Sequence, residues 1–480
     1  MSSAAEQFLR DAATKSADLV HREIIRRNMD SYEAAHQRGR SRIKNWEAAR
    51  RRCQEIKREA IEHLDKYLLQ FEEKVIAHGG HVFWAANGDE ACAYIKDLAV
   101  SRNVRTVVKS KSMVTEEIHL SPVLEKVGIK VWETDLGEFI VQLRNEPPYH
   151  IVTPAMHLNR QQIRELFREK LGEDIADADP QKLVALARRK LREAFFAAEM
   201  GISGANFLVA DSGAIAISTN EGNGRLSTSL PRIHVAVTGI EKIVPRLEDL
   251  GTLWPVLATS GTGQPITTYS TLIGGPRRPS EADGPEEFHV VLLDNGRSSL
   301  LANAEEREVL TCIRCGACLN ICPVYRNIGG HTYNTTYQGP IGSVLTPHLR
   351  GNDFQHLAQA SSLCGACSSV CPVNINLHHH LLHNRRDAAA SGNAKASERA
   401  QFRLWRTAML HPGLYRLGGW MMRRSLRLLY GMGLAGTVFD PMRAWSRKRT
   451  PMPLPAKSFR TRWKEGLEKE EQGRGQVGNK

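Results

Sequence analysis

The sequence has little of what membrane-spanning or secreted proteins contain. Uncharged apolar runs are short, and none reaches the roughly 18 residues that a transmembrane helix requires. The segment Met1–Gln7 also lacks the basic-then-apolar layout of a secretory signal peptide. We therefore predict a cytoplasmic protein, in a reducing compartment where disulfide bonds are rare.

Motifs for a bound nicotinamide or flavin, and for a serine nucleophile, are also missing. No Gly-x-Gly-x-x-Gly follows a predicted strand, and Ser212 does not lie in a Gly-x-Ser-x-Gly context. Because these motifs are missing, we expect any two-electron chemistry to take place on a partner protein or at an unusual site.

Positive charge is concentrated near the C-terminal end of the chain. The formal net charge is +13, and residues 401–480 contain 17 Lys and Arg against 5 Asp and Glu, a balance of +12. This distribution indicates one basic element that contacts a specific neighbour. It disfavours a nucleic-acid-binding surface that covers the whole protein. The triplet Arg50-Arg51-Arg52 is interleaved with acidic residues, which predicts a solvated helix face and no RNA binding.

Cysteine is scarce outside one short segment. Of nine cysteines, only Cys53 and Cys92 lie outside residues 312–371, and both are interpreted as buried thiols. The others form two runs with two-residue gaps, each closed by a Cys-Pro pair: Cys312-x-x-Cys315-x-x-Cys318-x-x-x-Cys322-Pro323 and Cys364-x-x-Cys367-x-x-x-Cys371-Pro372. This spacing is typical of proteins that hold two iron–sulfur clusters. Structural zinc sites use cysteine pairs separated by one longer gap, so zinc is disfavoured.

The same pattern predicts which cysteines share a cluster. Three cysteines of a run bind one cluster, and the fourth reaches the other cluster. Two 4Fe-4S clusters are therefore predicted, cluster 1 bound by Cys312, Cys315, Cys318 and Cys371, and cluster 2 by Cys322, Cys364 and Cys367. Gly316 after Cys315 and Gly365 after Cys364 let the backbone pass close to a cluster.

The second run is one ligand short, because Ser361 stands where a complete run would have its first cysteine. Three interpretations of cluster 2 stay open. It is a three-iron cluster, a four-iron cluster whose last iron takes Ser361, a histidine or water, or a four-iron cluster with an open iron. His378, His379, His380 and His383 follow this run. They are interpreted as a solvated helix face, and the alternative is that one of them supplies the missing ligand.

Periodicity divides the chain into four parts: a helical region over 1–78, an α/β domain over 79–300, a two-cluster domain over 301–392 and a basic helical region over 393–480. Within the α/β domain, short apolar runs alternate with helical patterns, which predicts a largely parallel sheet. Helices are expected at Asp89–Ala99, after a cap at Thr115, and at Gln161–Met200. The expected strands are His81–Trp84, Thr106–Val108, Lys130–Trp132, Phe139–Leu143, Phe207–Ala210, Ala214–Ile217, Ile233–Val237 and His289–Leu293.

Two loops of the α/β domain have the composition of ligand-binding loops. Lys109–Ser112 lies between a strand and a helix cap, where ammonium and backbone N–H groups would hold an anion, unless it is an ordinary polar loop. Ala210–Gly213 and Thr219–Asn223 flank one strand, as expected either of a site at a sheet edge or of hairpin turns. Glu221 is a weak candidate for a catalytic base or nucleophile, with no identifiable partner.

The apolar stretch Leu414–Phe439 is interrupted by four arginines. It is interpreted as a helix packed on the cluster domain or on a partner subunit. The alternative is an interfacial helix, with Trp420 in the headgroup region and arginines on anionic lipid. That alternative would place the protein peripherally at the inner face of the membrane, close to a quinone.

Taken together, these features resemble the lactate-utilisation protein B family over nearly the whole chain. The cysteine runs are shared by many electron-transfer subunits, including those of succinate and glycerol-3-phosphate dehydrogenases, whereas Ala210–Gly213 with Thr219–Asn223 is more specific. Val107–Leu143 and the closing Ser458-Phe459-Arg460 add to the likeness. The resemblance implies an α/β LUD domain, related to ribose-phosphate isomerases and CoA transferases, and a mostly helical ferredoxin-like domain. Family members likewise bind cluster 2 through three cysteines.

The resemblance also implies joint action with two sister proteins, a cysteine-rich iron–sulfur protein and a second LUD-domain protein, in the oxidation of L-lactate to pyruvate. We therefore predict an electron-transfer component of an L-lactate dehydrogenase complex, which passes electrons through its clusters to an unidentified acceptor. No nucleic acid is expected as a partner. The competing hypothesis is an acyl- or CoA-type transferase or ligase that acts through Glu221, with structural or sensory clusters.

Overall fold

The computed structural model describes residues 3–173, 175–391, 396–446, 449–450 and 453–466. The chain divides into two compact units, with the division after Ser391. The first unit contains the α/β domain together with both cysteine runs, and the second contains the basic C-terminal region. The two units are described separately.

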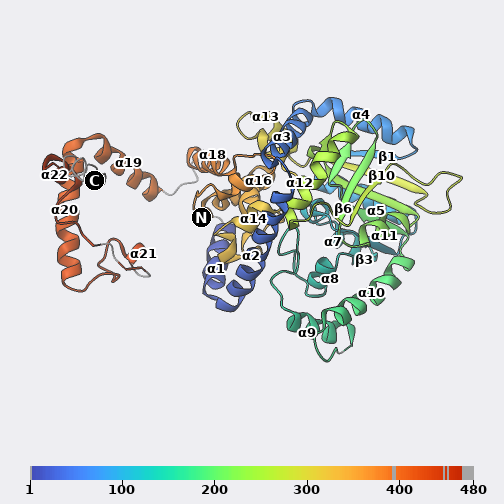
Figure 1. The fold of residues 1–480 in the computed structure, drawn as a ribbon, viewed down its shortest axis with the longest axis horizontal. Helices are drawn as coiled ribbons and strands as arrows, with labels where there is room; N and C mark the ends of the chain where they lie inside the picture. The colour runs from blue at the N-terminus through green and yellow to red at the C-terminus, as the bar shows by residue number, and fades with distance from the viewer. Residues whose placement is uncertain (1–2, 174, 392–395, 447–448, 451–452, 467–480) are drawn as a thin grey trace, which may run out of the picture. The chain divides into compact units, whose positions relative to one another are not determined.

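A six-stranded parallel sheet forms the centre of the first unit (Figure 1). Its strand order is β1-β10-β7-β4-β2-β3, and every neighbouring pair is parallel. All seven residues of the central strand β7 are buried, as expected of a parallel strand covered on both faces. The strands are β1 (His81–Ala85), β10 (Glu287–Leu293), β7 (Ile233–Gly239), β4 (Met200–Ser203), β2 (Thr106–Lys109) and β3 (Lys130–Glu133). The predicted parallel α/β fold is thereby confirmed.

A second, four-stranded sheet has the order β8-β5-β6-β9. It contains β5 (Phe207–Val209), β6 (Ala214–Thr219), β8 (Ile243–Val244) and β9 (Tyr269–Ile273). β5 and β6 are antiparallel and form a hairpin, so the candidate loop Ala210–Gly213 is a hairpin turn. Gly213 has a φ of +68° in this turn, a conformation that glycine adopts without strain.

Alternating residues of the parallel strands enter two separate cores. Val291 and Leu293 of β10 pack with α5 (Gly88–Ser101) and α7 (Leu120–Glu125) on one face of the sheet. Phe288, Val290 and Leu292 face the opposite side and join a larger core. This larger core continues without interruption into the cysteine-rich segment, so the α/β domain and the cysteine runs share one hydrophobic interior.

Three sequence-based predictions in the α/β domain are wrong. The segment predicted as the strand Phe139–Leu143 is the helix α8 (Leu136–Leu143), whose buried Phe139, Ile140 and Val141 mimic a strand. The side chain of Asp135 starts this helix by accepting a hydrogen bond from the Glu138 backbone N–H.

The single long helix predicted over Gln161–Met200 is two helices, α9 (Arg160–Leu171) and α10 (Pro180–Ala197), followed by β4. Ser112, and not Thr115, caps α6 (Met113–Glu117), because the Ser112 hydroxyl accepts the Thr115 N–H.

The N-terminal helices are part of the first unit and pack against its other elements. They are α1 (Ser3–Ala17), α2 (Leu19–Arg42), α3 (Trp46–Glu62) and α4 (Leu64–Ala77). α2 and α3 pack on α12 (Leu250–Thr262), and α2 also packs on two helices of the cysteine-rich segment, α14 (Ala317–Ile321) and α15 (Tyr325–Ile328). Figure 1 shows α1 and α2 beside this segment. The N-terminal region therefore forms a wall of the candidate site.

The remaining helices of the first unit complete the cysteine-rich segment or precede it. They are α11 (Asn223–Ser229), α13 (Arg297–Ala302), α16 (Gly339–Arg350), α17 (Ala366–Val370) and α18 (Leu377–Ala390). α14 begins two residues after Cys315, α17 begins two residues after Cys364, and the two helices pack against one another. α16 and α18 pack together beside them.

The second unit is helical and exposes many apolar side chains. Its described helices are α19 (Ala396–Leu410), α20 (Pro412–Gly431), α21 (Arg443–Ser446) and α22 (Phe459–Lys464). α20 buries only Leu426, and α19 buries none of its residues. Within the described ranges, no helix combines the length and apolarity needed to cross a membrane. Parts of the predicted basic helical region over 393–480 lie outside the described residues, namely 393–395, 447–448, 451–452 and 467–480.

Candidate metal centre

The two cysteine runs follow the same backbone path. In each run a non-glycine residue with a positive φ precedes a cysteine at the same place in the motif: Arg314 at +60° precedes Cys315, and Leu363 at +55° precedes Cys364. A glycine with a positive φ follows each of these cysteines, Gly316 at +81° and Gly365 at +77°. Each run then forms a short helix, α14 or α17, and the last cysteine ends that helix in an extended conformation. The chain therefore builds the same local structure twice.

Four cysteines line one cavity, which is otherwise mostly apolar. They come from both runs: Cys312, Cys315, Cys318 and Cys371. Burial raises the pKa of the Cys315 thiol, and the nearby Cys371 and Cys312 raise it further. The residues that line this cavity offer four sulfur donors and no carboxylate, and this donor set fits an iron–sulfur cluster.

The other three cysteines of the runs form a second group nearer the surface. Burial raises the pKa of Cys367 to about 11, and the neighbouring Cys322 and Cys364 add to the rise. Cys364 is exposed, and a hydrogen bond from the Ala366 backbone N–H lowers its pKa. Cys312, Cys315, Cys318 and Cys371 therefore share one cavity, whereas Cys322, Cys364 and Cys367 lie near one another with Cys364 beside solvent; the assignment of these cysteines to two clusters stays a prediction.

Aromatic rings cover the second group from the protein side. Tyr325 and Tyr333 are buried and stacked, with ring centroids 5.9 Å apart, and both lie near enough to Cys322 for its charge to raise their pKa values beyond the effect of burial. Phe8 of α1 packs edge-on against Tyr333, with centroids 6.0 Å apart. The rings that cover the second group therefore come both from the segment between the cysteine runs and from the N-terminal helix α1.

Arg50 contradicts the prediction that Arg50-Arg51-Arg52 is a solvated helix face. Its side chain is buried, and its Nε and Nη2 atoms donate to the backbone carbonyl of Cys371 at 3.0 and 2.8 Å. Arg51 and Arg52 are exposed, as predicted. Sequence reasoning missed Arg50 because its partner lies 321 residues away.

A buried chain of charged groups connects the first cysteine group to the parallel sheet. Arg314 lies within 3.3 Å of Glu241, and Glu241 lies within 2.6 Å of Arg297. Arg297 in turn pairs with Glu117 at 2.7 Å. Burial alone would raise the pKa of Glu241, but Arg297 and Arg314 lower it to about 2, so this carboxylate stays ionised.

Two lysines add positive charge beside the first cysteine group. Lys57 donates to the backbone carbonyls of Glu241 and Ile243 at 2.7 and 2.9 Å. Burial lowers the pKa of Lys57 to about 7 and that of Lys242 to about 8, while the charge at Cys312 opposes both shifts. Together with Arg314, these residues compensate the negative charge that a thiolate-bound cluster carries.

The Lys109–Ser112 loop is folded against protein groups. Lys109 is buried, and its Nζ lies 2.8 Å from carboxylate oxygens of both Glu116 and Glu133. The Nζ of Lys111 donates to the backbone carbonyl of Val152. Both ammonium groups are therefore engaged within the protein, and the geometry gives the anion-site hypothesis no support.

Glu221 lies just beyond β6, at the N-terminal side of α11. Its carboxylate accepts a hydrogen bond from the Leu136 N–H at 3.2 Å. Burial raises the pKa of Glu221 to about 7, and the Asp135 carboxylate contributes to the rise. Asp211 accepts the Leu247 N–H and stabilises the hairpin region. Glu221 is nevertheless exposed as a residue, so the loop that contains it presents to solvent a carboxyl with a pKa near neutrality.

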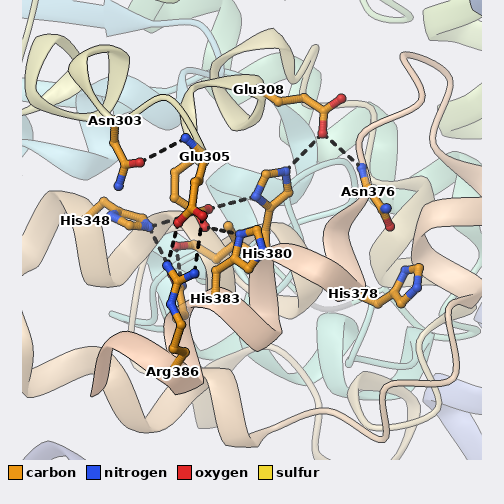
Figure 2. Close-up of polar contacts among 12 residues, drawn as sticks. Asn303, Glu305, Glu308, His348, Asn376, His378, His380, His383 and Arg386 are labelled. Atoms are coloured by element: carbon orange, nitrogen blue, oxygen red, sulfur yellow. Dashed lines mark hydrogen bonds and ion pairs between the residues drawn. The ribbon is translucent and has the colours of Figure 1, made fainter. Parts of the chain in front are cut away.

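The histidines after the second run do not form the predicted solvated face. His380 is buried, with Nδ1 2.8 Å from Glu306 and Nε2 3.0 Å from Glu308 (Figure 2). His383 contacts the second Glu306 oxygen at 2.8 Å. Burial alone would lower the pKa of His380, but the two carboxylates raise it to about 9. These contacts hold α18 against the segment that precedes Cys312.

The other two histidines behave differently. His379 is exposed, as predicted. Figure 2 shows His378 apart from His380 and His383, and its Nδ1 lies 2.7 Å from the Ser368 hydroxyl.

Comparisons with known proteins agree with this architecture. Residues 68–293 match the LUD domain, residues 308–375 match the 4Fe-4S dicluster domain, and residues 378–467 match the C-terminal region of lactate utilisation protein B. The fold and the cysteine centre therefore define an iron–sulfur protein with a LUD domain.

Curated relatives share almost the full length of the chain. A lactate utilization protein B from Bacillus licheniformis is 43% identical over 467 residues, covering 97% of this chain and 95% of the relative. The protein of that name from Bacillus cereus is 44% identical, covering 87% of this chain and 88% of the relative. This chain belongs to the lactate utilisation protein B family. A solved duf162 family protein from Deinococcus radiodurans aligns with a TM-score of 0.26 and 15% identity, over 48% of this chain and 98% of that one.

Proposed function

We propose that this chain is the electron-transfer subunit of a complex that oxidises L-lactate to pyruvate. The observation that carries the proposal is the gathering of seven cysteines from two distant runs into two adjacent groups. Cys312, Cys315, Cys318 and Cys371 would hold cluster 1, and Cys322, Cys364 and Cys367 would hold cluster 2. Such clusters supply one-electron transfer.

The chain's own residues give the two groups different roles. The first group is enclosed and surrounded by Arg314, Lys57 and Lys242, which stabilise additional negative charge. The second group includes the exposed Cys364, which gives a redox partner access from solvent. Oxidation of one lactate to pyruvate releases two electrons and two protons, so two one-electron carriers together accept the full electron yield.

The partners in this proposal are a cysteine-rich iron–sulfur protein and a second LUD-domain protein, with a quinone-linked acceptor. The direct test mixes the anaerobically reconstituted full-length protein with those partners and follows cluster reduction by electron paramagnetic resonance (EPR). L-lactate, but not D-lactate, is expected to reduce the clusters, and Cys315→Ala is expected to abolish reduction of cluster 1. Absence of lactate-dependent reduction in the complete mixture contradicts the proposal.

We further propose that α20 binds an anionic membrane surface from the cytoplasmic side. Arg416, Arg423, Arg424 and Arg427 lie on a helix whose Leu414, Leu417, Trp420 and Met421 are between 47% and 51% exposed. This combination of exposed apolar side chains and arginines suits anionic headgroups. Co-sedimentation with vesicles containing phosphatidylserine, and not with pure phosphatidylcholine vesicles, is expected. Equal binding to both, or none, contradicts this assignment.

A second candidate function rests on Glu221. A carboxyl with a pKa of about 7 beside Asp135 is suited to proton transfer or nucleophilic attack. The activity would be acyl or CoA transfer by the α/β domain. Steady-state transfer by the isolated protein, lost in Glu221→Gln, would favour it over electron transfer.

A further inference from the structure

The two cysteine runs are related position by position. Each residue of the second run lies 49 positions after its counterpart in the first, so Cys364, Cys367 and Cys371 correspond to Cys315, Cys318 and Cys322. By the same offset, Ser361 corresponds to Cys312. The repeated positive-φ residues and the repeated short helices show that this correspondence holds in the backbone as well as in the sequence.

The correspondence extends to the side-chain atom of Ser361. In the first run, the Arg314 backbone N–H donates to Cys312 Sγ at 3.4 Å. In the second run, the Leu363 backbone N–H donates to Ser361 Oγ at 3.1 Å. The Ser361 hydroxyl therefore occupies in the second run the place that the Cys312 sulfur occupies in the first, and Cys312 lines the first cavity.

The backbone around Ser361 is held in place by a second contact. Arg385 of α18 donates to the Ser361 carbonyl at 3.0 Å and to the Ala358 carbonyl at 2.9 Å. The hydroxyl oxygen is thus presented by a fixed loop, as a ligand must be.

The histidines are worse placed for the same role. His380 and His383 are bound to Glu306. His378 lies near Gly365, but its Nδ1 is already engaged by the Ser368 hydroxyl. No histidine occupies the position that the internal repeat assigns to the missing ligand.

We propose that Ser361 Oγ is the fourth protein ligand of cluster 2, completing the set of Cys322, Cys364 and Cys367. This inference rests on the proposed assignment of those cysteines. On binding, the hydroxyl loses its proton to solvent, and the resulting oxygen anion binds the iron that no cysteine reaches. Cluster 2 is then a four-iron cluster with mixed sulfur and oxygen ligation. An oxygen ligand is harder than a thiolate and stabilises the oxidised state, so cluster 2 has a lower reduction potential than an all-cysteine version.

The test compares anaerobically reconstituted full-length protein with Ser361→Ala and Ser361→Cys. Iron and sulfide are counted per chain, and EPR is recorded during mild oxidation and during a reductive titration. We expect Ser361→Ala to lose one iron from cluster 2 on mild oxidation, with the EPR signal of a three-iron cluster. We expect Ser361→Cys to keep all four irons and to reduce at a higher potential than the wild type.

Two matched variants serve as controls. Ser369→Ala removes an exposed hydroxyl of the same run that bonds only the Ala366 carbonyl, and His378→Ala removes the nearest histidine. Both are expected to retain wild-type iron content and potentials.

The proposal is overturned if Ser361→Ala matches the wild type, if Ser361→Cys leaves the potential unchanged, or if His378→Ala alone produces the three-iron signal. A wild-type protein whose cluster 2 holds three irons after reconstitution also overturns it. If Ser361→Ala does not fold, the Ser361→Cys titration decides alone. Failure of the broader function is distinct, because clusters that L-lactate does not reduce in the complete mixture contradict the proposed function without changing the iron count or the potentials of the Ser361 variants.

Discussion

The buried His380 should make the cluster segment less stable as the pH rises above neutrality. Its imidazole lies between the carboxylates of Glu306 and Glu308, which raise its pKa from 6.5 to about 9 despite burial. The folded protein therefore holds this proton more tightly than the unfolded chain does. The resulting stabilisation is fully present below pH 6.5 and is lost as the pH rises through about 9.

The size of the effect follows from the two pKa values. One pKa unit corresponds to about 1.4 kcal/mol, so a rise from 6.5 to about 9 contributes about 3 kcal/mol at low pH. Because only 3% of His380 is exposed, solvent screening reduces this figure little. Between pH 6.5 and pH 9 we expect the loss of about 2–3 kcal/mol of local stability, followed by little further change.

Amide hydrogen exchange of α18, corrected for the intrinsic pH dependence of exchange, measures this quantity in the cluster-loaded protein. The wild-type opening free energy should fall across the window, whereas His380→Gln should show no corresponding fall. His379→Gln, which alters an exposed neighbour, should follow the wild type. If His380→Gln and the wild type have the same pH slope, His380 is not the titrating group and the reasoning is refuted.

Three further predictions concern the candidate site. Gly316→Ala should reduce the iron content of cluster 1, because the added Cβ would lie 2.9 Å from a Val152 side-chain atom at a backbone φ of +81°. The Cβ of Gly365→Ala would meet no atom closer than 3.9 Å, so this variant should reduce the iron content of cluster 2 less. Arg50→Gln should lower the free energy of unfolding, measured by chemical denaturation, by about 1.5–3 kcal/mol, because it removes two charged hydrogen bonds to the Cys371 carbonyl. The control Arg51→Gln, at an exposed position, should change the free energy of unfolding by less than about 0.5 kcal/mol. Glu221→Gln should leave lactate-dependent cluster reduction unchanged. If this variant lost the reduction, Glu221 would instead take part in the oxidation of lactate.

The cysteine spacing predicted the pairing of distant residues because ligand geometry imposes strict local rules. Two-residue gaps and a closing Cys-Pro are enough to predict a grouping of the seven cysteines, and in the structure Cys371 lines the same cavity as Cys312, Cys315 and Cys318. The parallel sheet was likewise predictable, since its central strands are apolar on both faces and so read as continuous apolar runs.

Long-range packing and buried charge were not predictable in the same way. Arg50 and His380 have the local sequence context of solvated helix residues, and only the tertiary structure supplies the Cys371 carbonyl and Glu306 as partners. Phe139 lies in a short apolar run whose length suits either a strand or a buried helix, and the cap at Asp135 was the signal that distinguished them. Local pattern therefore predicts the candidate ligands but not the charged groups that surround them.

The central claim is that two runs of cysteine interlock around two iron–sulfur clusters. Iron and acid-labile sulfide analysis of anaerobically purified protein, combined with EPR of the dithionite-reduced sample, tests it most directly. We predict about eight irons and eight sulfides per chain, from two four-iron clusters, and the signal of two clusters close enough to interact magnetically. Colourless protein that contains zinc and no iron would contradict the account.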